Sequence, residues 1–145
     1  MTLQNLLGVS LAEVTPDRAT VTRLLAAASR NIADAKLAAL SAENRFDAAY
    51  KAIMQLSMIA LHANGFRTLT SKPGHHQTAI QTLPKTVGIA AEQMIVLDAL
   101  RKLRNVADYS GDLVPESAVR ECIESAEALR VHMKGWLGTN KPELV

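Results

Sequence analysis

The sequence predicts an all-α fold, an up-down bundle of four main helices plus one short helix. Three observations lead to this prediction. Apolar residues make up 48% of the chain but aromatic residues only 3%, and Gly and Pro are few. That composition is typical of close-packed helices rather than of a turn-rich sandwich. In addition, apolar residues recur at alternating steps of four and three, the period of an amphipathic helix, over several long segments.

Length and composition also limit the function classes. With 145 residues, the chain is long enough for one domain with a proper core. The formal charge of +2 is too small to indicate nucleic-acid binding without local clustering. The single cysteine, Cys122, excludes an intramolecular disulfide, and we expect it to be a small core residue. No signal peptide and no run of transmembrane length is recognised, so we expect a cytoplasmic protein without membrane contact.

We divide the chain into an N-terminal arm over residues 1–14, a helical bundle over residues 15–138 and a polar tail over residues 139–145. The arm is mildly apolar, and we expect it to pack on a neighbouring segment or on a partner. No strand pattern is found in the sequence.

The first helix is predicted to begin at Thr15, Pro16 and Asp17. Thr offers a cap oxygen, Pro suits the first helical position and Asp complements the positive end of the helix. The apolar periodicity then predicts a helix to about Leu40, with a break near residues 41–44.

The second helix carries apolar residues on two faces, which indicates burial on two sides, and it should end at Asn64 and Gly65. Because the break before it is short, the first two helices should form an antiparallel hairpin. We expect a loop over residues 66–74, a short helix over residues 74–81, and a break or kink at Pro84.

The last two helices are predicted over residues 89–109 and from Pro115 to Gly138, joined by a loop over residues 110–114. The final helix starts with Pro and acidic residues, which favour a helix N-terminus. His75 and His76 point about 100° apart on a helix, and no acid or cysteine near them in the sequence completes a metal shell. We therefore predict no metal and no cofactor.

One stretch concentrates polar chemistry, from Arg101 to Tyr109. Arg104 and Asp108 are four residues apart, so they share one side of a helix, whereas Arg104 and Tyr109 are about 140° apart and do not easily meet. One interpretation is an ordinary surface ion pair contributing about 0.2–0.5 kcal/mol, with Tyr109 preceding a glycine cap at Gly111. The other interpretation is a binding or catalytic site.

A resemblance supports the second interpretation. The order of the elements, the second-helix start Asn44 to Tyr50, the loop with His75 and His76, and Arg104 to Tyr109 together resemble the HEPN superfamily. HEPN proteins are small helical bundles of prokaryotic toxin–antitoxin and antiphage systems. The similarity covers most of the chain, about residues 15–137.

The resemblance implies a homodimer. RNA-cleaving HEPN proteins carry an Arg, a polar residue that is often Asn, and a nearby His, and two protomers bring two such motifs together. The Arg stabilises the charge of the scissile phosphate and the His handles the proton of the 2′-hydroxyl group. Here Arg104 and Asn105 match, but Tyr109 stands in the His position, and a phenol with a reference pKa of about 10 is a poor base at neutral pH. The pattern resembles HEPN branches that have kept binding and lost cleavage.

Three functions follow as hypotheses. The first is a non-catalytic protein of a toxin–antitoxin or defence system, which binds RNA or a nucleotide through a dimeric groove and pairs with a nucleotidyltransferase or an antitoxin. Its binding residues are Arg101, Lys102, Arg104 and Asn105. The second is a metal-independent HEPN ribonuclease toxin that uses Arg104, Asp108 and Tyr109. The third is a structural module for dimerisation or partner binding, in which the polar cluster only holds two helices in register.

Overall fold

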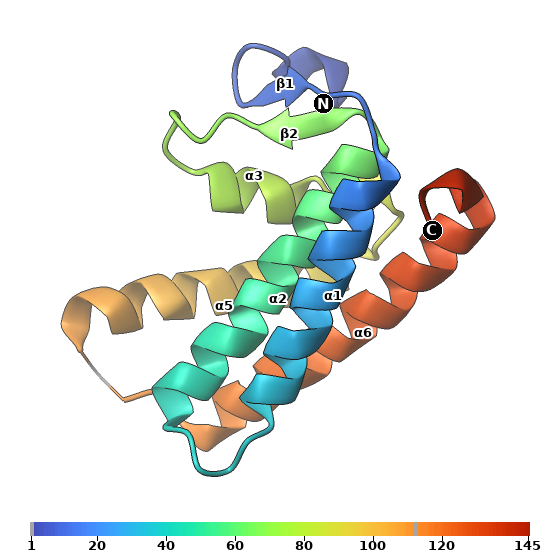
Figure 1. Ribbon diagram of the computed structural model, residues 1–145. Coiled ribbons are helices and arrows are strands. Elements are labelled where there is room, and N and C mark those ends of the chain that lie inside the picture. The colour runs from blue at the N-terminus through green and yellow to red at the C-terminus, as the bar shows by residue number, and fades with distance from the viewer. Residues whose placement is uncertain (1, 112) are drawn as a thin grey trace.

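The computed structural model describes residues 2–111 and 113–145 and is mostly helical (Figure 1). Met1 of the expected arm and Asp112 of the expected loop lie outside the described residues. The helices and strands follow in chain order: η1 Gln4–Leu6, β1 Leu11–Glu13, α1 Arg18–Ala35, α2 Ala42–Ala63, β2 Phe66–Thr68, α3 His75–Gln81, α4 Leu83–Thr86, α5 Ala91–Ser110, α6 Glu116–Asn140 and η2 Pro142–Leu144.

Helices α1 and α2 form the predicted hairpin (Figure 1). A hydrogen bond of 2.8 Å from Asn31 Nδ2 to Gln55 Oε1 joins them near their middle. Two details differ from prediction. The cap of α1 is Asp17, whose carboxylate accepts from the Thr20 backbone N–H, so Thr15 and Pro16 precede the helix. The helix also ends at Ala35 and not near Leu40, because Leu37 and Leu40 are exposed and no burial stabilises a further turn.

Helix α2 is the central element of the core, as its two apolar stripes predicted. It starts at the cap Ser41, whose side chain accepts from the Asn44 backbone N–H. It ends at the predicted stop, with Asn64 as its cap and Gly65 in a left-handed conformation, at φ 89°. Its fully buried side chains pack against α1 on one side and α6 on the other. These include Phe46, Tyr50, Ile53, Leu56, Ile59 and Leu61.

A small sheet replaces part of what we expected to be irregular. Residues of the arm and of the loop after α2 pair as antiparallel strands, with Leu11 opposite Thr68 and Glu13 opposite Phe66. The prediction of no strand was therefore wrong, because three-residue strands are too short to show an alternating pattern. The sheet buries Leu11 and Phe66, so the arm packs on its own domain at the end of α2.

The second half of the chain follows the predicted order. Pro84 lies in the first turn of α4, directly after α3, so the expected break produces two short helices instead of one. Gly111 closes α5 with φ 72°, as predicted. Helix α6 continues to Asn140, past the expected end at Gly138, and Leu144 is buried. The expected polar tail is thus mostly structured and contributes to the core.

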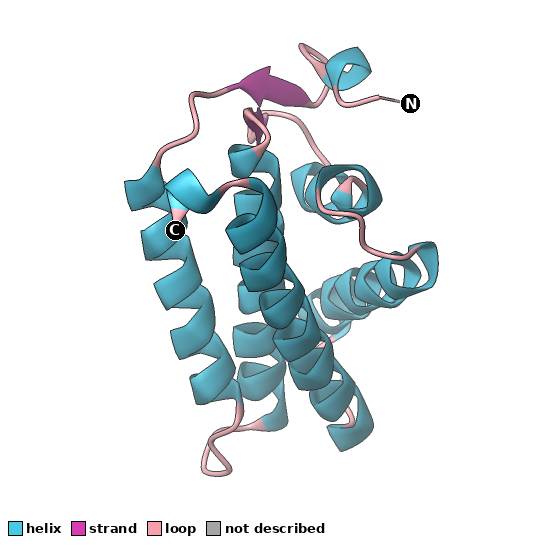
Figure 2. Cartoon of the chain, turned by 90° about the vertical axis from the view of Figure 1, so that its right-hand side faces the viewer, coloured by secondary structure: helices cyan, strands magenta, loops and turns pink. Residues whose placement is uncertain are grey.

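The helices are arranged in two directions. Helices α1, α2 and α6 run lengthwise beside one another (Figures 1 and 2), whereas α5 projects sideways from them (Figure 1). The all-α class is confirmed, apart from the small sheet, but the up-down arrangement is seen for three of the four long helices. None of the described helices combines the length and the apolar character needed to cross a membrane.

Candidate functional site

The predicted cluster on α5 is divided between two sides of that helix. Arg104 and Asp108 face the start of α2, and their ion pair, with Nη2 3.9 Å from Oδ2, confirms that they share one side. Lys102 and Asn105 are exposed, and Tyr109 is 94% exposed near the end of the helix. One protomer therefore does not bring Arg104 and Tyr109 together.

Arg101 has a structural partner. Its Nε donates to Asp98 Oδ1 over 2.8 Å, and both side chains are largely buried between α5 and neighbouring helices. Burial acts to raise the pKa of Asp98, but the hydrogen bond and charge of Arg101, with a hydrogen bond from Gln81 of α3, hold that pKa below its usual value. Lys102 lies on the solvent side of Asp98, 3.7 Å from Oδ2. Arg101 is thus held by a partner on its own helix, and Asp98 in turn joins α5 to α3 through Gln81.

Arg104 is the predicted residue that lines a substantial cavity. This cavity has a volume of about 560 Å³ and lies among α1, α2, α3 and α5. We call it the Arg104 cavity; it is lined by Leu24, Asp47, Tyr50, Lys51, Met54, Gln55, Met58, His76 and Arg104. A smaller cavity of about 100 Å³ lies against Arg104, Asp108 and Gly111.

The guanidinium group of Arg104 is held in place, but no carboxylate forms a short, hydrogen-bonded ion pair with it. It lies over the ring of Tyr50, 5.1 Å from the ring centroid, a cation–π contact. Asp47 Oδ1 is 3.6 Å from its Nε, too long for a hydrogen bond. Nε is buried and has no hydrogen-bond partner. Within residues 2–111 and 113–145 no hydrogen bond occupies its N–H donors, and the side chain is 32% exposed.

Tyr50 and His76 complete the polar wall beside Arg104. The Tyr50 hydroxyl group lies 3.3 Å from His76 Nδ1, within hydrogen-bonding distance. Burial raises the pKa of Tyr50 to about 12, so its phenol stays neutral. Burial, followed by the charges of His75, Arg104 and Arg101, lowers the pKa of His76 below 6.5. At neutral pH His76 is therefore an uncharged imidazole beside a cation.

Lys51, Tyr50 and His76 were not among the residues predicted for the site. Tyr50 and the two histidines entered the sequence analysis through the HEPN resemblance, and His75 and His76 were also considered as metal ligands. In the part of the chain that the structure describes, no group of three His, Cys, Asp or Glu side chains is placed to hold a metal ion. The pairing of His76 with Tyr50 and Arg104 depends on three helices meeting, which no local pattern reveals.

The described arrangement fits an anionic ligand. Arg104 and Lys51 outnumber the carboxylate of Asp47 in the cavity, and the neutral groups of Tyr50, Gln55 and His76 offer hydrogen bonds. Apolar side chains at the other end, Met54 and Met58, suit a flat or apolar part of the same ligand.

Comparisons of the chain with models of protein families, with curated proteins and with solved structures find no match.

The lowered pKa of His76 gives a prediction for NMR. We expect its ring signals to titrate below pH 6.5. Because the unfolded state takes up this proton first, the contribution of His76 to the free energy of unfolding is present above pH 6.5 and is lost as the pH falls through the folded-state pKa. Removing a nearby positive charge with Arg104→Gln should raise the pKa of His76, whereas Lys134→Gln, on α6, should leave it unchanged. A His76 pKa at or above 6.5 in the unaltered protein would contradict this site geometry.

Proposed function

We propose that the protein binds RNA or a nucleotide, with a phosphate group held by Arg104 in the cavity between α2 and α5. The observation that carries the proposal is the guanidinium group of Arg104, which lies over Tyr50 and whose Nε has no hydrogen-bond partner among the described residues. Arginine binds phosphate through two parallel N–H bonds, so a fixed and unsaturated guanidinium group is suited to this ligand. Lys51 on α2 supplies a second positive charge.

The resemblance to HEPN proteins supports the same proposal from the sequence. Arg104 and Asn105 match the start of the HEPN motif, and Tyr109 replaces its His. We therefore propose a binding protein of a toxin–antitoxin or defence system rather than an active nuclease. Of the four residues predicted to bind, Arg104 is retained as the main contact; Arg101 acts through its pair with Asp98, and Lys102 and Asn105 lie on the outer side of α5.

Binding of a short single-stranded RNA tests this proposal. Arg104→Ala should weaken binding about 10- to 100-fold, because it removes charge-assisted hydrogen bonds to phosphate. Lys102→Ala is the matched control, since it removes the same charge from the same helix outside the cavity, and should change affinity by about twofold or less. Fluorescence anisotropy at a fixed salt concentration gives both values. Equal effects of the two substitutions would contradict a site in the Arg104 cavity.

Metal-independent RNA cleavage is a second candidate function, favoured by the position of His76. A neutral imidazole next to Arg104 has the protonation state that a general base needs, which Tyr50 does not offer at neutral pH because its pKa is raised to about 12. In this case the residues are Arg104 and His76, in place of Arg104, Asp108 and Tyr109.

A cleavage assay in the presence of a chelator separates the two candidates. The binding function predicts intact RNA. Ribonuclease activity predicts products ending in a 2′,3′-cyclic phosphate, a loss of at least about 100-fold with His76→Ala, and little change with Tyr109→Phe. Cleavage that depends on Tyr109 and not on His76 would contradict the assignment of His76 as the base.

We also propose a homodimer formed through the outer side of α5. Ile95 and Val106 are exposed and three turns apart, so they lie on the same side of the helix, and Tyr109 extends this surface. Lys102 lies among them, seven residues from Ile95 and four from Val106. A second copy would cover these apolar side chains and bring the two α5 helices together, as the HEPN resemblance implies.

The solution mass tests the dimer. Sedimentation should give twice the chain mass, and Val106→Glu should shift the protein towards the monomer because it places a charge in the interface. Val131→Glu is the control, since Val131 is also exposed but lies on α6. A monomer at all concentrations, or an equal effect of both substitutions, would contradict this interface.

A further inference from the structure

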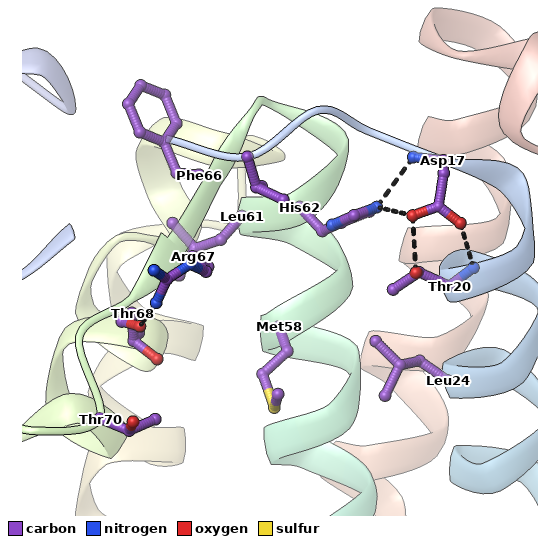
Figure 3. A pocket seen from close by; sticks show the side chains of 11 residues that line it. Asp17, Thr20, Leu24, Met58, Leu61, His62, Phe66, Arg67, Thr68 and Thr70 are labelled. Atoms are coloured by element: carbon purple, nitrogen blue, oxygen red, sulfur yellow. Dashed lines mark hydrogen bonds and ion pairs between the residues drawn. The ribbon is translucent and has the colours of Figure 1, made fainter. Parts of the chain in front are cut away.

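Another cavity, of about 330 Å³, lies near the C-terminal end of α2. It forms where the start of α1, the end of α2 and β2 meet (Figure 3). We call it the Arg67 cavity; its apolar lining consists of Val14, Leu24, Met58, Leu61 and Phe66. Its volume and mostly apolar lining are those of a site for a small organic molecule.

His62 occupies one side of the Arg67 cavity as a neutral ring. The Asp17 backbone N–H donates to its Nε2 over 3.0 Å, so Nε2 has no proton. An ion pair of Nε2 with Asp17 Oδ2, 3.5 Å away, would require the opposite protonation state, and the shorter hydrogen bond decides for the neutral ring. Nδ1 then carries the proton. Within the described residues no acceptor binds Nδ1, so it remains a donor.

The carboxylate of Asp17 is already occupied. Its Oδ1 accepts from the Thr20 backbone N–H over 2.8 Å, and its Oδ2 accepts from the Thr20 hydroxyl group over 2.7 Å. These two bonds, the largest influences on it, lower the pKa of Asp17. The carboxylate caps α1 and is not available to bind a cationic ligand.

Arg67 is the cationic residue of this cavity that can bind an anionic ligand. It lies on β2, on the opposite side of the cavity from Asp17 (Figure 3). Its described contact is a long one, 3.5 Å from Nη1 to the Thr68 carbonyl oxygen, and no carboxylate pairs with it in the described part of the chain. An unpaired guanidinium group beside an apolar cavity is suited to a carboxylate attached to a hydrocarbon group.

We propose that the Arg67 cavity binds small amphipathic carboxylates, with the carboxylate on Arg67 and the hydrocarbon part against Leu24, Met58 and Leu61. This proposal does not depend on RNA or nucleotide binding. The two cavities are neighbours, however, because Leu24 and Met58 line both of them. A ligand in one cavity therefore contacts side chains that also shape the other.

Calorimetric titration with sodium octanoate tests the proposal, with 1-octanol and octylamine as the neutral and cationic probes. Octanoate should bind, and the other two should bind at least about tenfold more weakly, because only the carboxylate can pair with Arg67. Arg67→Ala should reduce the affinity for octanoate by the same factor, and Lys72→Ala, an exposed cation outside the lining, should not. No octanoate binding, equal binding of octanol, or preferred binding of octylamine would overturn the proposal.

Two experiments test where octanoate binds: amide NMR spectra, and a substitution that blocks the cavity. Octanoate should shift the amide signals of residues 66–70 more than those around Tyr50. Thr70→Trp places a large ring at the exposed edge of the cavity and should weaken octanoate binding while the melting temperature stays close to that of the unaltered protein. Shifts centred on Tyr50 and Arg104, or unchanged octanoate binding by the Thr70→Trp protein, would overturn the assignment to this cavity.

Discussion

Burial of α2 on two sides is the constraint on which the rest of the structure depends. A helix that packs against α1 on one side and α6 on the other has little surface left for polar side chains. Three of its polar residues, Asp47, Lys51 and Gln55, lie along one line, at steps of four. Both cavities open beside this part of the helix, one at each end. The packing of the core thus decides where a ligand can bind.

Helix α5 places the positive charge of Arg104 beside the row of polar residues on α2. Because α5 crosses α2 instead of running beside it, only a short part of α5 contacts the start of α2, and Arg104 lies at that contact (Figure 1). Asp98 of the same helix accepts a hydrogen bond from Gln81 and so joins α5 to α3. The low effective dielectric of a partly buried site strengthens the field of Arg104. Tyr50 and His76 stay neutral beside it, so Arg104 and Lys51 are the cations that line the cavity, while Asp47 and Asp108 lie 3.6 and 3.9 Å from the Arg104 guanidinium group.

Patterns of residues close in the sequence predicted most of the helices and one ion pair of the candidate site. The start and end of α2, the break at Pro84, the cap at Gly111 and the pairing of Arg104 with Asp108 follow from residues close in sequence. Cys122 is buried as its place on an apolar stripe indicated, and burial raises its pKa to about 12. What the patterns missed depends on distant segments. The two short strands pair residues more than fifty positions apart, and Tyr50, His76 and Arg104 meet only because α2, α3 and α5 converge.

The groove predicted along α5 stays a prediction, but its four residues do not share one side of the helix. Successive residues on a helix are rotated by about 100°, so these four point over a wide arc. Arg101, Lys102, Arg104 and Asn105 seemed one cluster along the sequence. In three dimensions they divide into a structural pair, a cavity residue and two residues on the outer surface.

The most direct test of the account is a crystal structure of the protein with a bound RNA dinucleotide. The account predicts that phosphate oxygens accept hydrogen bonds from Arg104, with Lys51 nearby and a base against Met54 and Met58. A phosphate bound instead at Lys102 and Asn105 on the outer side of α5, with the Arg104 cavity empty, would contradict the central claim.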